Sequence, residues 1–241
     1  ACVVEVNNDK AKDLVIASGG NEYSNKEIHL LPRVYLNDGK GSLHPLPGAV
    51  DSIYLTASSV APCDFNNDGF MDLFIGARAV PRHYGEIPQS YLLMNDGTGK
   101  FKDVTATYAK DLANVGFVTK GLWCDIDKDG DSDLIVSLKW DGICAFINHK
   151  GYFTKKYLTS KKGWWNFVMA CDIDNDGDID LIAGNLGQNS RLKASEKESV
   201  RLYYNDFDGN GEKEQVVTYY LQGRELPFAS KDELQRRIPV I

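Results

Sequence analysis

The residues best suited to chemistry in this sequence are acidic side chains that recur in a fixed pattern. From Asp172 to Asp180, carboxylates occupy positions 1, 3, 5 and 9, and glycine occupies position 6. Like charges a few ångströms apart repel one another strongly unless a cation lies between them. Alternate positions of a tight loop direct their oxygens inward, and glycine at position 6 allows the positive φ of the turn. Hard oxygen donors in this number favour Ca²⁺ over Zn²⁺ or copper, so we predict a calcium loop rather than a solvated acidic turn.

The pattern occurs five times in the chain. The predicted metal ligands at positions 1, 3, 5 and 9 are Glu5, Asn7, Asp9 and Asp13; Asp64, Asn66, Asp68 and Asp72; Asp125, Asp127, Asp129 and Asp133; Asp172, Asp174, Asp176 and Asp180; and Asp206, Asp208, Asn210 and Glu214. The acidic residues among these predicted ligands are half of the chain's 34, so the net charge of −7 mainly reflects cation binding. That charge, with no basic cluster among aromatic residues, argues against nucleic acid as a partner.

Two of the five loops depart from the pattern. The first has Lys10 where glycine is expected, which strains the turn by roughly 1 kcal/mol and adds a positive charge near the ion. We expect this loop to bind weakly or to be empty. The last loop ends in Glu214 and is spaced differently, with Asn205 merging a hairpin turn into it, and we expect it to bind.

A second motif alternates with the acidic loops. Asn-containing turns lie between apolar runs at Asn37-Asp38-Gly39, Asn95-Asp96-Gly97 and Asn148 to Gly151. They predict hairpins, because Asn and Gly tolerate positive φ. Residues 57–106 accordingly predict strands at 57–63, 72–78, 90–94 and 100–105. Four antiparallel strands at a period of about 50 residues describe a propeller blade.

The predicted fold class is therefore an all-β propeller of four-stranded antiparallel blades. We divide one domain over residues 1–241 into approximate blades at 1–49, 50–112, 113–160 and 161–200, with a partial blade at 201–241. This count of about four and a half fits either a compact five-bladed ring or part of a larger one. An incomplete ring would expose edge strands and favour a homodimer. Ser230 and Glu233 form a capping-box pattern that predicts a short helix at 231–238, ended by Pro239.

Cysteine usage does not decide the redox compartment. Cys63, Cys124 and Cys171 each precede position 1 of a loop, and Cys2 lies on the same strand face ahead of the first loop. We expect these four to be buried thiols that fill one recurring core position, and leave Cys144 unassigned. No apolar stretch is long enough to cross a membrane. The chain begins directly on a strand-like segment and resembles a mature or excised piece of a longer product.

The segments DFNNDGFMDLFIGAR and CDIDNDGDIDLIAGN resemble FG-GAP or VCBS repeats, which build the calcium-binding β-propellers of integrin α chains and many bacterial surface proteins. ARAVPRHYGEIPQSYLLMNDG and GNLGQNSR followed by LYYNDFDGNG resemble, more narrowly, the bacterial propellers similar to cartilage acidic protein. The resemblance covers nearly the whole chain. It implies that each loop joins the first and second strands of a blade and holds one Ca²⁺.

Two classes of function fit these observations. The first is a non-catalytic, calcium-stabilised binding module that recognises a protein or glycan outside the cell or on its surface, including a bacterial outer surface or periplasm. The second is a propeller domain of a polysaccharide lyase or hydrolase. Common catalytic motifs are absent from the sequence, and the carboxylates are committed to the loops, which favours the binding module. External millimolar calcium suits such loops.

Aromatic, cationic and amide residues occupy the connections that would face away from the loops. The predicted ligand-binding residues are Arg82, His83, Tyr84, Trp164, Trp165, Asn189 and Arg191. Side chains of these types on the loops of a rigid ring would make a recognition surface. Alternatively, Trp164 or Trp165 packs between blades, and Arg82 and Arg191 anchor the loops that carry them.

Overall fold

The computed structural model describes residues 1–187 and 189–240, and the chain divides into two compact units. The first unit comprises residues 1–81 and 87–185, and the second comprises residues 82–86 and the chain from Leu186 onward. Residue 241, where the last predicted blade ends, lies outside the described residues. The single domain and its blade boundaries stay predictions. Within the described part, no helix has the length and hydropathy needed to cross a membrane.

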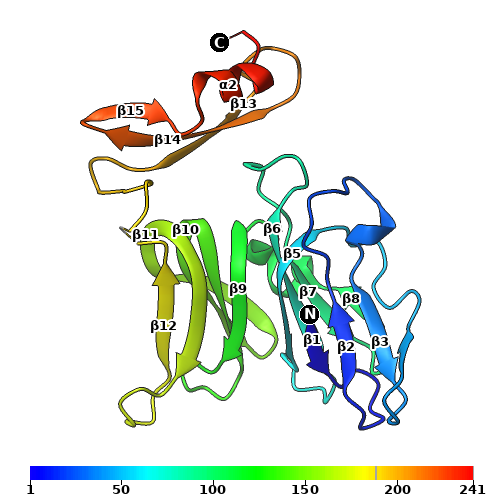
Figure 1. Ribbon diagram of the computed structural model, residues 1–241. Helices are drawn as coiled ribbons and strands as arrows, with labels where there is room; N and C mark the ends of the chain where they lie inside the picture. Colours follow the sequence, from blue (N-terminus) through cyan, green and yellow to red (C-terminus); the bar gives the residue numbers. More distant parts are fainter. Residues whose placement is uncertain (188, 241) are drawn as a thin grey trace. The chain divides into compact units, whose positions relative to one another are not determined.

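The first unit begins with two antiparallel sheets of four strands each (Figure 1). The first sheet contains β1 (Cys2–Val4), β2 (Asp13–Ile16), β3 (Arg33–Asn37) and β4 (Leu43–Pro45) in that order. The second contains β5 (Thr56–Cys63), β6 (Asp72–Ala79), β7 (Tyr91–Asn95) and β8 (Phe101–Asp103). The predicted strands of this second sheet are confirmed with small shifts at their ends. Short helical turns that the sequence did not predict lie in the connections: η1 (Ile28–Leu30), α1 (Thr105–Tyr108) and η2 (Lys110–Leu112).

The third sheet of this unit has the order β12-β11-β10-β9. Its strands are β9 (Phe117–Cys124), β10 (Asp133–His149), β11 (Tyr152–Cys171) and β12 (Asp180–Asn185). The ends of β10 meet, because the Asn148 backbone N–H donates to Asp133 Oδ1 at 2.7 Å, whereas a straight strand would separate them by roughly 50 Å. The bend lies at Trp140, whose φ is 65°. β10 therefore supplies both the second and the third strand of the predicted repeat.

β11 serves two neighbouring repeats. Thr159 in its first half pairs with Ile143 of β10, whereas Trp165 in its second half pairs with Asn185 of β12. β11 changes partner between Trp164, which pairs with Lys139, and Trp165, a few residues beyond the expected boundary at residue 160. β12 then follows the fourth acidic loop, as β2, β6 and β10 follow the first three.

The second unit contains a three-stranded antiparallel sheet and a helix. The sheet has the order β13 (Arg201–Asn205), β14 (Glu214–Leu221) and β15 (Arg224–Pro227). The helix α2 spans Lys231–Arg237. Its predicted capping box is confirmed, because Ser230 Oγ accepts from the Glu233 backbone N–H and Glu233 Oε2 accepts from the Ser230 backbone N–H.

The apolar core of the first unit consists of three clusters that join successive repeats. Val15, Phe74 and Ile135 occupy equivalent positions in β2, β6 and β10, and each is 0% exposed. Val15 packs in a cluster with residues of β6, Phe74 with residues of β9 and β10, and Ile135 with Val168 of β11. Gly121 permits the second of these contacts, since a Cβ there would lie 2.3 Å from the Phe74 ring. Burial between repeats therefore supplies much of the driving force for folding.

A polar network accompanies this core at the end of each of the first three acidic loops. The position 9 carboxylates Asp13, Asp72 and Asp133 are 0% exposed. In the third repeat, Asp133 Oδ2 accepts from the Ile126 backbone N–H at 2.9 Å, and its Oδ1 accepts from the N–H of Asn148. The carboxylate thus joins the start of the loop to the hairpin turn, and its hydrogen bonds offset the cost of burial.

The hairpin asparagines connect one repeat to the previous one. Asn148 Nδ2 donates to the Phe65 carbonyl at 2.8 Å, and Asn95 Nδ2 donates to the Val6 carbonyl at 2.9 Å. Both acceptors are at position 2 of the preceding acidic loop. The hairpins were predicted correctly, but the reason given for asparagine was wrong. The positive φ falls on glycines such as Gly97 and Gly151, and asparagine is required for its side-chain hydrogen bonds.

We predict that Asn148→Ala lowers the free energy of unfolding by about 3 kcal/mol, because it leaves buried carbonyl and N–H groups without partners. Denaturant unfolding measures the loss. His149→Ala, at the exposed neighbouring position, is the control and should change stability little. Equal stability of the two variants would contradict the role assigned to Asn148.

Candidate metal-binding loops

The five acidic loops share one backbone conformation. Each lies between the two residues of an antiparallel pair: Val4 and Asp13, Cys63 and Asp72, Cys124 and Asp133, Cys171 and Asp180, and Asn205 and Glu214. Positive φ occurs at position 4 (Asn8, Asn67, Lys128, Asn175 and Gly209) and at position 6 (Lys10, Gly69, Gly130, Gly177 and Gly211). The sequence pattern therefore predicted both the location of the loops and the turn at position 6.

Backbone N–H groups fix the acidic side chains within each loop. In the third loop, Asp125 Oδ2 accepts from the Gly130 N–H at 3.0 Å, and Asp129 Oδ1 accepts from the Asp131 N–H at 2.9 Å. Position 1 and position 5 make the same bonds in the second loop. These bonds hold the remaining carboxylate oxygens close together in the loop.

Three of the loops bring oxygens from positions 1, 3 and 9 within 4.8 Å of one another. They are Asp125, Asp127 and Asp133; Asp172, Asp174 and Asp180; and Asp206, Asp208 and Glu214. Three carboxylates at this separation form a site of strongly negative potential, which a divalent cation with hard-oxygen preference fits.

The first two loops carry asparagine at position 3. Its Nδ2 donates to the position 5 carboxylate at 2.9 Å in both loops, from Asn7 to Asp9 and from Asn66 to Asp68. Asn7 Oδ1 is buried and has no hydrogen-bond partner among the described residues. A buried carbonyl oxygen without a partner costs free energy, which a cation bound among these acidic residues would offset. The sequence predicted this loop to be weak or empty. Its Asn7 Oδ1 is nevertheless an unpaired oxygen that could act as a metal ligand.

Lys10 adopts the strained conformation that the sequence predicted, with φ of 71°. The loop closes around it nonetheless, and its N–H donates to Glu5 Oε2 at 3.0 Å. The backbone of the first loop is therefore built like the others, at the cost of a left-handed lysine.

We predict that Lys10→Gly raises the free energy of unfolding by roughly 1 kcal/mol, because glycine adopts this φ without steric cost. Thermal or denaturant unfolding measures the change. The reciprocal Gly130→Lys substitution, at φ 93° in the third loop, should lower stability by a similar amount. If both substitutions changed the free energy of unfolding in the same direction, backbone strain would not be the cause of these changes.

The electrostatic environment of the position 9 carboxylates also favours a cation. Burial raises the pKa of Asp72 to about 7, and the nearby Asp68 and Asp64 carboxylates add to the rise against the hydrogen bonds from backbone N–H groups. Burial likewise raises the pKa of Asp133, to which Asp127 and Asp129 contribute. A cation in the loop would favour the ionised form of both carboxylates and so oppose this rise.

This shift predicts a pH dependence of stability in chelator. The Asp72 pKa rises from 3.8 in the unfolded chain to about 7 in the fold, so the folded state binds more protons in this window. Its contribution to stability is present below pH 4 and is lost as the pH rises towards 7. Melting temperatures of the chain and of Asp72→Asn, which cannot titrate, should diverge across this range. In calcium, the melting temperatures of the two proteins should change with pH in the same way. If they also run parallel across this pH range in chelator, the raised pKa of Asp72 is contradicted.

Neighbouring loops are linked through side chains that were not predicted as site residues. Asn67 Nδ2, at position 4 of the second loop, donates to Asp131 Oδ1, at position 7 of the third, at 3.2 Å. Lys128, at position 4 of the third loop, pairs with Asp178 at position 7 of the fourth. Complementary residues at position 4 of one loop and position 7 of the next could have predicted this contact from the sequence. Both pairs are exposed, so each contributes little stability alone, but they align the second, third and fourth loops side by side.

The cysteine prediction requires correction. All five cysteines are free, and Cys63, Cys124 and Cys171 are half-buried at the ends of their strands, while the unassigned Cys144 is the fully buried one. Cys2 does not occupy the recurring position, because Val4 is the residue that pairs opposite position 9 in the first repeat. Burial raises the pKa of the Cys63, Cys124 and Cys144 thiols to about 11, so these thiols are protonated at neutral pH.

The predicted recognition residues do not form one group within either unit. Trp164 and Trp165 belong to β11 of the first unit, whereas Arg82, His83, Tyr84, Asn189 and Arg191 belong to the second. Trp165 packs on the cluster around Ile135, and its Nε1 donates to the Lys161 carbonyl at 3.0 Å. The packing alternative is therefore confirmed for Trp165.

Trp164 has a different environment. Its ring contacts Trp140 edge to face, with centroids 5.0 Å apart, and Lys139 Nζ lies 5.7 Å from its centroid. The pair sits at the bend of β10, where Trp140 has the positive φ that bulky residues rarely adopt. The two tryptophans therefore hold the bend together.

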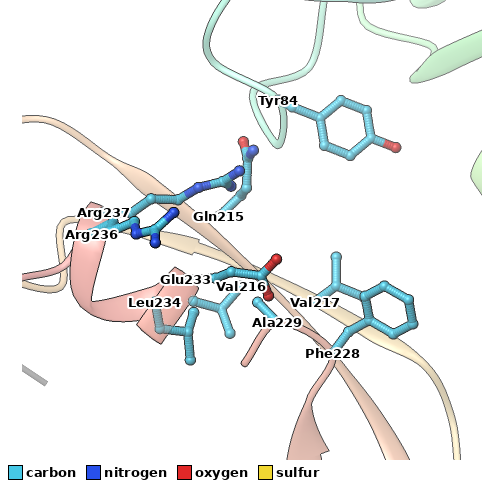
Figure 2. A pocket seen from close by; sticks show the side chains of 10 residues that line it. All are labelled: Tyr84, Gln215, Val216, Val217, Phe228, Ala229, Glu233, Leu234, Arg236 and Arg237. Atoms are coloured by element: carbon cyan, nitrogen blue, oxygen red, sulfur yellow. The ribbon is translucent and has the colours of Figure 1, made fainter. Parts of the chain in front are cut away.

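In the second unit, two of the predicted residues approach one cavity. Tyr84 lines it together with Phe228, as Figure 2 shows. The Arg191 guanidinium lies 5.1 Å from the centroid of Phe228, so it stacks on a wall residue. Asn189 is exposed, and the His83 carbonyl accepts from the Glu86 N–H within its own turn.

Comparison with known families identifies the repeats. The model of the FG-GAP-like repeat matches residues 6–75 and 125–183, which together make up more than half of the 241 residues. The chain belongs to the FG-GAP-like repeat family. The matched ranges contain the second, third and fourth acidic loops and all of the first except Glu5, whereas β1 and β9, which precede the first and third loops, lie outside them.

Proposed function

We propose that this chain is a calcium-stabilised, propeller-type interaction module without catalytic activity, acting outside the cell or on its surface. The observation that carries the proposal is the repetition of one loop geometry, with carboxylate oxygens of positions 1, 3 and 9 gathered within 4.8 Å in three loops. Family membership supports it, because FG-GAP-like repeats are typical of β-propeller interaction modules. Calcium would join oxygens of a loop and clamp the two strands that the loop connects.

The distribution of unusual carboxyl groups supports a binding role over the alternative, a polysaccharide-active enzyme. Among the described residues, the carboxyls with a raised pKa are Asp72 and Asp133. Both accept hydrogen bonds from the backbone and belong to metal loops. A general acid for glycan cleavage would need such a carboxyl in an accessible cleft instead.

We further propose that the repeats belong to a closed ring. Val15, Phe74 and Ile135 are fully buried against the next repeat, whereas the equivalent residue of the fourth repeat, Ile182, is 44% exposed. Phe167 and Met169, on the adjacent strand, are 47% and 40% exposed. This apolar face is the one that earlier repeats bury, so a further blade packed on it would complete the pattern.

Calcium binding tests the proposal. Removing the ion with a strong chelator should lower the melting temperature by several degrees, because calcium binds the native state alone. Asp174→Ala should reduce the number of ions bound, measured by titration calorimetry, by one. Asp178→Ala in the same loop, where the carboxylate pairs with Lys128, is the matched control and should leave the number unchanged.

Three results would contradict the proposal. A melting temperature that the chelator does not change would remove calcium from the stability of the fold. Loss of every ion in Asp174→Ala would show that the loops are not separate sites. Finding the native protein in the cytosol would argue against the extracellular location.

A further inference from the structure

The second unit contains an open edge of β14 beside its cavity. The ladder between β14 and β15 ends with the bond from the Phe228 N–H to the Val217 carbonyl at 2.8 Å. Beyond it the chain leaves the sheet, because the Ser230 N–H donates to Glu233 Oε2 and starts α2. The first residues of β14 therefore have no strand on this side.

Gln215 presents its backbone at this open edge. Backbone groups in a strand point alternately to the two sides, so Gln215 directs its N–H and carbonyl the same way as Val217, away from β13. No backbone bond from this side reaches Gln215 among the described residues. An exposed edge of this kind can accept an extended peptide as an added strand.

The cavity next to this edge has a volume of about 500 Å³ and mixed walls. Apolar side chains form most of its lining: Val216, Val217, Phe228, Ala229 and Leu234. In Figure 2 the guanidinium groups of Arg236 and Arg237 lie on one side of the cavity and Phe228 on the other. An occupant therefore meets an apolar surface and a pair of cations.

These two arginines are available for an anion. Neither guanidinium lies within ion-pair distance of a carboxylate in the described part of the chain. The acidic residue of the cavity, Glu233, is committed to the capping box, where both bonds to Ser230 use its Oε2. The cavity thus holds two cations against one carboxylate, which favours a ligand carboxylate.

We propose that this cavity binds an extended peptide with an apolar side chain followed by a carboxylate, in the simplest case a peptide C-terminus. The peptide backbone would pair with Gln215 as a short added strand, its apolar side chain would contact Val217 and Phe228, and its carboxylate would pair with Arg236 and Arg237. A free strand edge recognises peptide backbone and the aliphatic lining suits an apolar side chain, so both favour a peptide over a glycan. The inference rests on the proposed interaction function and names its ligand class.

The test uses the full 241-residue chain in saturating calcium and three synthetic probes. The first is acetyl-Thr-Val-Thr-Val-Leu with a free C-terminal carboxylate, whose β-branched residues favour an extended backbone. The second has a C-terminal amide and lacks the charge. The third keeps the carboxylate but is N-methylated at every residue, so it lacks backbone N–H donors. Amide chemical-shift titration should place the first probe at Gln215, and the other two should bind at least about tenfold more weakly.

Two variants separate the roles of charge and fold. The double variant Arg236→Gln and Arg237→Gln should weaken the first probe at least about tenfold and bring its affinity near that of the amide. Lys231→Gln, on the same helix but outside the cavity lining, should bind like the unchanged chain. Circular dichroism and melting temperature establish that both variants remain folded.

Equal binding of the carboxylate and amide probes, or shifts that avoid Gln215, would overturn the proposal. So would tri-galacturonate shifting the same amides in place of the peptide, since that would make the site a glycan site. The calcium titration is independent of these outcomes. Failure of peptide binding with intact calcium binding would remove this inference alone, whereas loss of calcium binding would remove the proposed function.

Discussion

The structure depends on a carboxylate that is buried at the end of each of the first three acidic loops. Water cannot solvate Asp13, Asp72 or Asp133, and an unpaired charge in such a place would destabilise the fold by several kcal/mol. Each is therefore surrounded by N–H donors, one from the start of its own loop and one from the hairpin turn of its own sheet. Loop, strand pair and hairpin are consequently one polar unit and not three separate features.

That unit links the acidic loops to the packing between repeats. The position 2 residue donates its N–H to the buried carboxylate and, in the first two loops, offers its carbonyl to an asparagine of the next sheet. The same short segment thus touches the acidic loop and the interface between repeats. A change in loop geometry is transmitted directly to that interface, where the large apolar side chains are buried. The peptide groups of the position 2 residue thus contact both the buried carboxylate and the next repeat.

Local patterns predicted most of the strands and loops because their causes lie within a few residues. Alternating acids, glycine at position 6 and Asn-Gly turns fix the backbone of one repeat, and they placed β5 to β8 nearly correctly. The bend of β10 at Trp140 escaped prediction, since nothing adjacent requires a tryptophan at positive φ. The role of Asn148 escaped as well, because its acceptor at Phe65 is 83 residues away. The recognition residues were grouped by residue type and by their place on connections expected to face away from the acidic loops, and the structure divides them between two units.

The asparagine bonds give the array a direction. Each of Asn95 and Asn148 donates to the repeat before it, so a repeat has a donating side and an accepting side, like a monomer in a polar filament. The first two junctions use the same complementary groups, so an array of this kind can be extended at one end without rebuilding its interior. Extension of the array by one repeat therefore requires duplication of a single unit and no new interface.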